Sequence, residues 1–220
     1  MSGAVASEHR AVAVAAGDPA AAACLVWRLS APMLVASTAP VGGGIGLRDW
    51  VLNLQVPEGY ARRDTEAHVA EVAGSLDLTG AGVGMLTAAD VGRVSVSDDE
   101  PGVRVEATVG LSLPVWAAAP DDARAQEMAR VPGTINIVAF VPTRHCDAAL
   151  ANLLCTVTEA KAQALADGGI PGTGTASDAV TVVCPSSGPV EPFGGPRSTY
   201  GAPLARAVYG ALRAGMEASA

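Results

Sequence analysis

The sequence predicts an α+β fold in which mixed sheet layers are covered by helices, and an αββα sandwich is one arrangement of such layers. Two patterns support this prediction. The first half of the 220-residue chain contains successive β-type runs with tight turns, and the second half contains a β-α-β pattern at about residues 134–184. Half of the residues are hydrophobic and 16% are charged, which is typical of a globular protein. We expect one domain at residues 21–220 after a loosely ordered segment at residues 1–20.

The elements outside the β-α-β pattern follow from local periodicity. Apolar, β-branched runs predict strands over residues 24–29, 33–37, 50–56, 92–96 and 103–113. Because tight turns separate these runs, we expect antiparallel pairing in the first half of the chain. Helical spacing predicts helices over residues 64–72 and about 202–216.

The β-α-β pattern begins with an apolar run, residues 135–141, that is typical of a strand buried on both faces. Pro142 ends this run, Thr143 is a suitable helix cap, and the helical pattern continues to the glycine pair at 168–169. Residues 179–184 form the second strand. The short connections predict that the two strands are parallel.

Simple geometry places three polar clusters at one end of this unit. The strand from Thr134 advances about 23 Å at about 3.3 Å per residue, and the helix returns about 21 Å by Glu159 at about 1.5 Å per residue. The loop of residues 172–178 must lie at the same end, because it leads into the second parallel strand. We therefore expect a cleft lined by Thr134, Asn136, Glu159, Lys161, Thr173, Thr175 and Asp178.

Two amides lie inside apolar runs, Asn53 and Asn136. An unpaired amide in a buried strand costs about 1 to 3 kcal/mol, so each must find hydrogen-bond partners. We expect Asn136 to point from the strand edge toward the polar cluster, and the same argument applies to Asn53. The alternative for both is an amide that is satisfied inside the protein.

Composition excludes several partners and compartments. The net charge of −8 argues against nucleic acid or an anionic membrane surface as partner, since both need clustered Lys and Arg. The apolar stretch near the N-terminus is interrupted at residues 17–19, so it fits neither a signal peptide nor a membrane span. Widely spaced cysteines predict free thiols, no metal site and a reducing compartment: Cys24, Cys146, Cys155 and Cys184. We expect a cytoplasmic protein.

Familiar catalytic motifs are missing. The glycine-rich residues 42–46 depart from the dinucleotide fingerprint, because Leu47 takes the place of the third glycine, and the loop of residues 172–178 lacks the lysine of a Walker A motif. A Ser-His-Asp triad is not expected. The three histidines are expected in a tail, on a helix surface and in a turn before a helix: His9, His68 and His145.

Five ordered pieces of the chain resemble the adenosylcobinamide amidohydrolase family, the cobinamide-salvage enzymes also called CbiZ. They are residues 42–46 with Asn53, 84–89, 132–137, 158–165, and 172–175 with 178–180. The resemblance runs from about residue 29 to residue 215. It implies hydrolysis of the amide that joins the corrin ring of adenosylcobinamide to aminopropanol, which releases adenosylcobyric acid for cobalamin synthesis. The corrinoid is then the substrate, and no cofactor or metal is required.

A fainter similarity concerns the order of Gly133-Thr134, apolar strand, helix and hydroxyl-rich loop. This order is similar to the second half of the L-aminopeptidase D-amidase/esterase and ornithine acetyltransferase families, which cleave themselves to expose an N-terminal nucleophile. Carried over, that residue is Thr134, and its freed α-amine would be the base. Without cleavage, Glu159 or Lys161 would activate Thr134, or water would attack with Glu159 or Asp178 as base.

Substrate binding and the choice of function are less constrained. A corrin is a wide disc fringed with amides, so neutral donors and acceptors suit it. Rim candidates are Ser37, Thr38, Asn53, and Arg197 and Ser198 at the end of a long Gly/Pro/Ser-rich loop, residues 185–198. Two other functions stay open: a corrinoid-binding protein without catalysis, and a self-processing peptidase or amidase. A homodimer is also left open.

Overall fold

The computed structural model describes residues 8–12, 22–120 and 133–219. Within these residues, eight strands form one mixed sheet with the order β4-β3-β2-β9-β7-β6-β5, and β1 pairs with β2. The strands of this sheet are β1 (Glu8–Val12), β2 (Ala22–Ser37), β3 (Gly44–Gln55), β4 (Gly82–Thr87), β5 (Ser95–Asp99), β6 (Val103–Val109), β7 (Ile135–Phe140) and β9 (Ala179–Cys184). The remaining elements are α1 (Thr65–Ser75), a 3₁₀ turn (Val91–Arg93), α3 (Asp147–Asp167), α4 (Gly201–Ser219) and the short parallel pair β8 (Arg144–His145) and β10 (Val190–Glu191).

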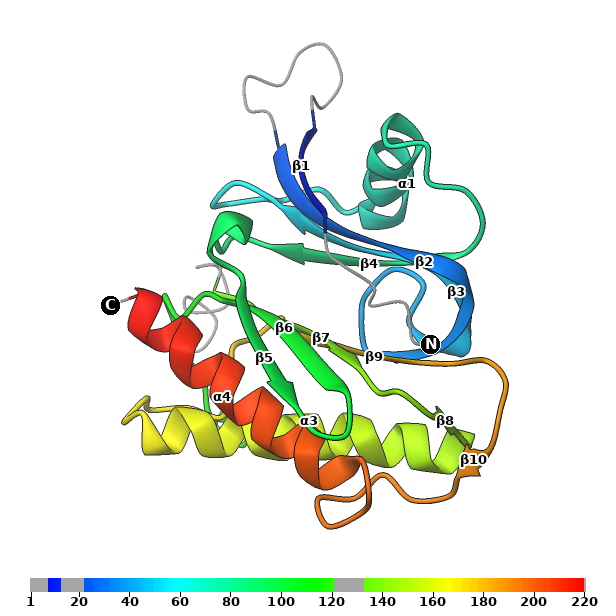
Figure 1. Cartoon of the computed structure of the whole chain (residues 1–220). Coiled ribbons are helices and arrows are strands. Elements are labelled where there is room, and N and C mark those ends of the chain that lie inside the picture. The colour runs from blue at the N-terminus through cyan, green and yellow to red at the C-terminus, as the bar shows by residue number, and fades with distance from the viewer. Residues whose placement is uncertain (1–7, 13–21, 121–132, 220) are drawn as a thin grey trace.

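The sheet folds over on itself (Figure 1). Strands β1 to β4 form a first half-sheet, and β5, β6, β7 and β9 form a second one, joined where β2 pairs with β9. The pairing of the long strand β2 with β3 shifts register between Arg28 and Met33. The inner faces of the two half-sheets share one apolar core, in which Val51 and Met85 of the first half-sheet belong to the same cluster as Val138 of the second.

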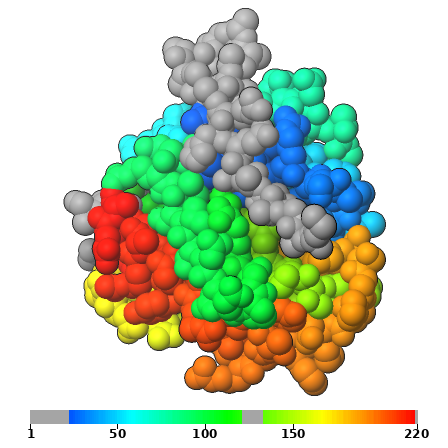
Figure 2. All heavy atoms as spheres, viewed as in Figure 1, coloured from blue at the N-terminus to red at the C-terminus, as the bar shows by residue number. Residues whose placement is uncertain are grey.

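Helices cover both outer faces. Helix α1 packs on the first half-sheet, where Val69 and Val72 belong to one cluster with Leu52 and Leu54. Helices α3 and α4 pack on the second half-sheet, and the space-filling view shows α4 beside β5 and β6 (Figure 2). The layers therefore run helix, half-sheet, half-sheet, helices, which is the αββα arrangement of the predicted α+β fold.

The β-α-β pattern predicted for residues 134–184 is confirmed. Strands β7 and β9 are adjacent and parallel, with Asn136 opposite Ala179, and α3 connects them. The helix begins later than expected. Its N-cap is Cys146 rather than Thr143, because Arg144 and His145 form β8.

The first half of the chain differs from the prediction in two ways. The runs at 24–29 and 33–37 belong to one strand, β2, and β3 pairs with β4 in parallel across α1, which makes a second β-α-β unit. Strand β4 escaped prediction because Gly82 and Gly84 interrupt its apolar pattern. Both glycines are required by packing, since a Cβ at Gly82 would lie 2.1 Å from the Trp50 ring.

Two further expectations concern the ends of elements. The run at 92–96 is divided between the 3₁₀ turn and β5, and the strand expected to reach residue 113 ends at Val109. Of the segment expected to be loosely ordered, residues 8–12 form β1, and the rest of residues 1–20 lies outside the described residues. In the described part of the chain, no helix is long and apolar enough to cross a membrane.

Candidate active site

A pocket of about 830 Å³ opens between the two half-sheets at the end where β7 and β9 begin. We call it the Thr134 pocket. The second half-sheet contributes Gly133, Thr134, Ala176 and Ser177 to its wall. The first half-sheet contributes the end of β4 and the segment between β3 and α1: Val56, Gly59, Tyr60, Ala61, Arg62, Thr65, Leu86, Thr87 and Ala88.

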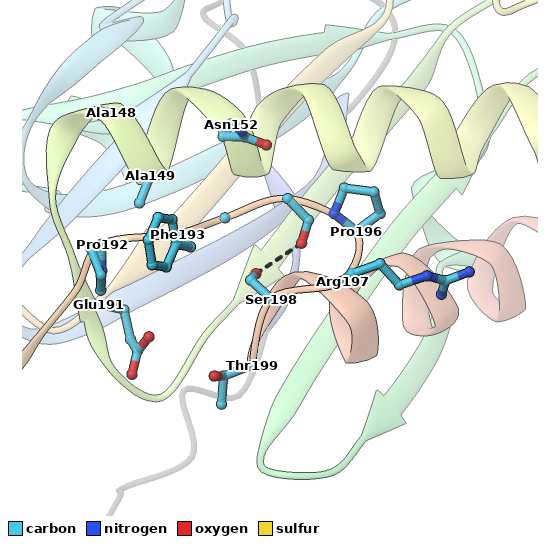
Figure 3. A pocket seen from close by; sticks show the side chains of 12 residues that line it. Ala148, Ala149, Asn152, Glu191, Pro192, Phe193, Pro196, Arg197, Ser198 and Thr199 are labelled. Carbon is cyan, nitrogen blue, oxygen red and sulfur yellow. Dashed lines mark hydrogen bonds between the residues drawn. The ribbon is translucent and has the colours of Figure 1, made fainter.

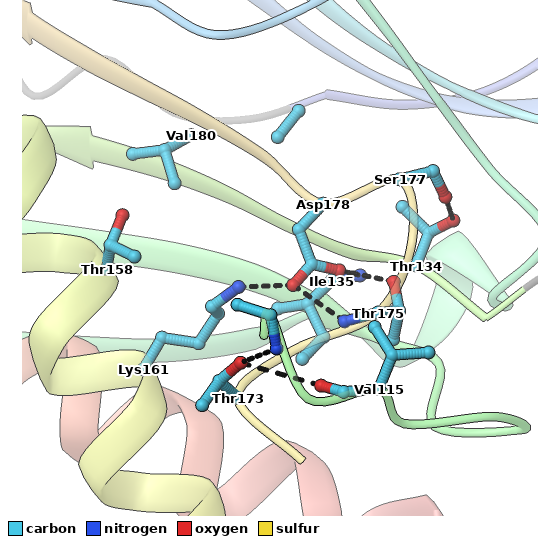
Figure 4. Close-up of polar contacts among 12 residues, drawn as sticks. Val115, Thr134, Ile135, Thr158, Lys161, Thr173, Thr175, Ser177, Asp178 and Val180 are labelled. Atoms are coloured by element: carbon cyan, nitrogen blue, oxygen red, sulfur yellow. Dashed lines mark hydrogen bonds and ion pairs between the residues drawn. The ribbon is translucent and has the colours of Figure 1, made fainter. Parts of the chain in front are cut away.

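Two hydroxyl groups in this pocket, those of Thr134 and Ser177, are candidates for nucleophilic chemistry. Thr134 Oγ1 lies 2.8 Å from Ser177 Oγ, and Ser177 Oγ lies 3.4 Å from the Gly133 carbonyl oxygen (Figure 4). Thr134 is 3% exposed, and its carbonyl accepts a hydrogen bond from Gly110 N at 3.0 Å. The Thr134 backbone is therefore fixed beside the end of β6, and its hydroxyl contacts Ser177 at the wall of the pocket.

Asp178 positions the loop that carries Ser177. Its carboxylate accepts from Ile135 N at 2.9 Å and from Thr175 N at 3.0 Å. It also accepts from the Thr175 hydroxyl and from the Lys161 ammonium of α3. The Lys161 and Asp178 side chains are only 8% and 9% exposed. Four donors occupy this carboxylate, so Asp178 joins the loop, the start of β7 and α3.

Thr173 holds the outer part of the same loop. Its hydroxyl accepts from Ala117 N at 3.0 Å, and its N–H donates to the Val115 carbonyl at 2.9 Å. The structure thus brings Thr134, Thr175 and Asp178 to one place with Lys161, whereas the Thr173 side chain is turned to the segment around Val115 (Figure 4).

Glu159 does not join this cluster. Its side chain is exposed, and none of the hydrogen bonds found among the described residues connects it with Thr134 or Asp178. The length argument placed the correct turn of α3 beside the loop but chose the wrong face. Residues two apart on a helix point in different directions, and Lys161 is the one that faces Asp178.

Asn53 and Asn136 are hydrogen-bonded inside the protein. They are 1% and 2% exposed. Asn136 Nδ2 donates to Asn53 Oδ1 at 2.8 Å and to the Leu86 carbonyl at 3.0 Å, while its Oδ1 accepts from Ala179 N at 3.2 Å. Asn53 Nδ2 donates to Thr108 Oγ1 at 3.0 Å. The expectation that Asn136 points from the strand edge is wrong; these amides connect the two half-sheets.

Comparison with known proteins decides the family. A family model described as adenosylcobinamide amidohydrolase matches residues 8–220. The chain belongs to the adenosylcobinamide amidohydrolase family. It is 35% identical over 181 residues to an adenosylcobinamide amidohydrolase of Halobacterium salinarum, and the aligned residues cover 80% of this chain and 77% of the relative. It is 29% identical over 186 residues to an adenosylcobinamide amidohydrolase of Methanosarcina mazei, and the aligned residues cover 80% of this chain and 87% of the relative.

Four of the rim residues predicted for this adenosylcobinamide amidohydrolase family member lie outside the Thr134 pocket. Ser37 Oγ lies 2.8 Å from Thr181 Oγ1, and Thr38 Oγ1 accepts from Val180 N at 2.9 Å, so both fix β2 to β9. Arg197 and Ser198 line a separate pocket of about 650 Å³ beside the first turns of α3 (Figure 3). Their loop leaves the end of β9, whereas the loop of residues 172–178 leads into its start.

Sequence reasoning missed three residues that lie between β3 and the middle of α1. Tyr60 and Arg62 line the pocket. His68 was expected on a helix surface, but it is only 6% exposed, and its Nδ1 lies 2.7 Å from the Tyr60 hydroxyl. The Arg62 guanidinium donates to Asp64 and Glu71, and it lowers the pKa of Asp64 to about 2. No motif connects these residues, and only their position before and within α1 was available as a signal.

Proposed function

We propose that the protein hydrolyses the amide between the corrin ring of adenosylcobinamide and aminopropanol, and that the reaction takes place in the Thr134 pocket. One observation supports this most directly: in a chain of the adenosylcobinamide amidohydrolase family, a hydroxyl pair 2.8 Å apart lines a pocket between the half-sheets. The products are adenosylcobyric acid and aminopropanol, which suits salvage of cobinamide for cobalamin synthesis.

In this proposal Thr134 is the nucleophile. Its Oγ1 attacks the amide carbonyl carbon while its proton passes through the Ser177 hydroxyl to solvent, and water then hydrolyses the resulting ester. Lys161 and Asp178 act indirectly, because their contacts hold Ser177 against Thr134. Self-cleavage before Thr134 stays a prediction, and two fragments on a denaturing gel are its expected sign.

The proposal needs no added cofactor. Across residues 8–12, 22–120 and 133–219, no group of three or more His, Cys, Asp or Glu side chains is arranged to hold a metal ion. We expect dialysis against EDTA to leave the turnover rate unchanged.

We also propose a cytoplasmic enzyme that acts on a small corrinoid and not on nucleic acid. The four cysteines are free thiols, and the net charge is −8; both features are compatible with this setting. A homodimer stays a prediction, which light scattering coupled to size-exclusion chromatography tests.

Incubation of the purified protein with adenosylcobinamide tests the function. Mass spectrometry is expected to detect a corrinoid with one new carboxylate together with free aminopropanol. Unchanged corrinoid that co-purifies with the protein would instead support a binding protein, and cleavage of peptides alone would support a peptidase.

A further inference from the structure

A second hydrogen-bonded pair, Tyr60 of the Thr134 pocket and His68 of α1, lies where the connection from β3 meets α1. The Tyr60 hydroxyl lies 2.7 Å from His68 Nδ1, and the two rings stack with centroids 5.5 Å apart. The Tyr60 N–H donates to the Pro57 carbonyl at 3.1 Å, which fixes the turn that carries the ring. Tyr60 lines the pocket, whereas His68 is buried behind it.

Amide cleavage at Thr134 requires a proton for the departing nitrogen, because an amide anion is a poor leaving group. Two of the side chains that line the pocket are titratable, those of Tyr60 and Arg62. An arginine guanidinium does not give up its proton in proteins. Lys161 is engaged by Asp178. Tyr60 is therefore the group in the pocket suited to donate a proton.

The charges around Tyr60 are compatible with this role. Burial raises the pKa of Tyr60, the Arg62 guanidinium lowers it, and the carboxylates of Asp64 and Glu71 raise it, with a net increase. The phenol is thus protonated at neutral pH. His68 Nδ1 is within hydrogen-bond distance of the phenolic oxygen, so it fixes the position of the Tyr60 hydroxyl.

We propose that Tyr60 is the general acid that protonates the leaving nitrogen, with His68 as the positioning residue that holds the Tyr60 hydroxyl in place. This assignment rests on the proposed function. As the Thr134 Oγ1–carbon bond forms and the carbon–nitrogen bond breaks, the Tyr60 proton moves to nitrogen, and water then reprotonates the Tyr60 phenolate. The Thr134 proton leaves through Ser177 to solvent, which balances the proton that Tyr60 takes from water. Water then splits the ester, which restores the Thr134 hydroxyl and releases the carboxylic acid.

A comparison of two leaving groups tests this assignment. The amine of adenosylcobinamide needs a proton to leave, whereas the phenolate of a p-nitrophenyl ester of adenosylcobyric acid does not. We expect Tyr60→Phe to lower kcat on the amide by about 10² to 10⁴-fold and to leave ester hydrolysis within about threefold. His68→Phe, which keeps a flat ring but loses the hydrogen bond, is expected to lower amide turnover selectively as well.

Tyr209→Phe is the matched control, because Tyr209 lies on α4 and its hydroxyl donates to Asp167; it is expected to keep both activities. Thermal melting of each variant reports whether it folds. If Tyr60→Phe lowers kcat equally on the amide and the ester, or lowers it on neither, the Tyr60 assignment is overturned while the proposed function stands. A wild-type protein that leaves the amide intact overturns the proposed function and this assignment with it.

Discussion

At the scale of single residues, Asp178 is where the contacts of the site meet. Its carboxylate and the Lys161 ammonium are both nearly inaccessible to solvent, and backbone N–H groups of Ile135 and Thr175 supply further donors. Removing one partner of a buried ion pair leaves the other charge buried without compensation, which is far more costly than removing a pair at the surface.

We predict that Lys161→Met lowers the free energy of unfolding by about 3 kcal/mol in urea denaturation. The matched control is Arg206→Met, which removes an exposed ion pair with Asp99 and is expected to cost less than about 1 kcal/mol. Equal losses in the two variants would show that the Lys161–Asp178 pair contributes no more than a surface pair.

The residues also show where sequence reasoning worked. The meeting of Thr134 with the loop of Asp178 could be predicted, because strand and helix lengths fix which ends of a β-α-β unit coincide. Glu159 was misplaced because length does not determine the rotation of a helix. Tyr60 and His68 were missed because a turn, not a repeating pattern, brings them together.

At the scale of elements, α3 begins without a side-chain cap. Its N-cap residue, Cys146, has φ −73° and ψ 163°, which is the extended backbone typical of an N-cap, yet its side chain donates to the Pro192 carbonyl and makes no capping hydrogen bond to the helix. The first N–H groups of this 21-residue helix therefore lack the partner that a serine hydroxyl would provide.

Cys146→Ser is predicted to stabilise the protein by about 1 kcal/mol, since the serine oxygen can accept from an N–H group of the first turn. Chemical denaturation measures the gain. Cys155→Ser, on the exposed side of the same helix, is the control and should change stability by less than about 0.5 kcal/mol. A loss of stability in Cys146→Ser would contradict this account of the helix start.

Elements with strong periodicity could be predicted, and those with hidden patterns could not. Strand β7, helix α3 and strand β9 carry long apolar runs or helical spacing, and all three are found. Strand β4 was missed because glycines replace side chains where Trp50 and Val69 pack against its backbone. Its parallel pairing with β3 was consequently missed too.

At the scale of the whole molecule, stability should depend on pH through a buried histidine. His145 is 0% exposed, its Nδ1 donates to the Thr143 carbonyl at 2.8 Å, and its Nε2 has no partner among the described residues. Burial lowers the pKa of His145 below its ordinary value of 6.5, against the opposing influences of the Thr143 carbonyl and the Glu191 carboxylate.

A lowered pKa means that the unfolded chain takes up a proton before the folded protein does. The stabilisation is therefore complete above pH 6.5 and is lost as pH falls through the folded-state pKa. We predict that the free energy of unfolding falls below pH 6.5 by up to about 1.4 kcal/mol per pH unit, and that this part is absent in His145→Asn. Parallel pH dependences of the two proteins in urea denaturation would contradict the prediction.

The layered arrangement also explains why the site residues predicted from the sequence lie in two separate pockets. The β-α-β unit has two ends, and the loops before and after β9 lie at opposite ones, so Thr134 and Arg197 cannot line the same site. Assigning the reaction to the end of Thr134 is the central claim.

The most direct test is the rate of aminopropanol release from adenosylcobinamide by Thr134→Val and Arg197→Ala, measured side by side with the wild-type protein. The account predicts a loss of at least about 10³-fold for Thr134→Val, which removes the attacking hydroxyl, and a rate within about twofold of wild type for Arg197→Ala. Full activity of Thr134→Val, or a comparable loss in Arg197→Ala, would contradict the assignment of the reaction to the Thr134 pocket.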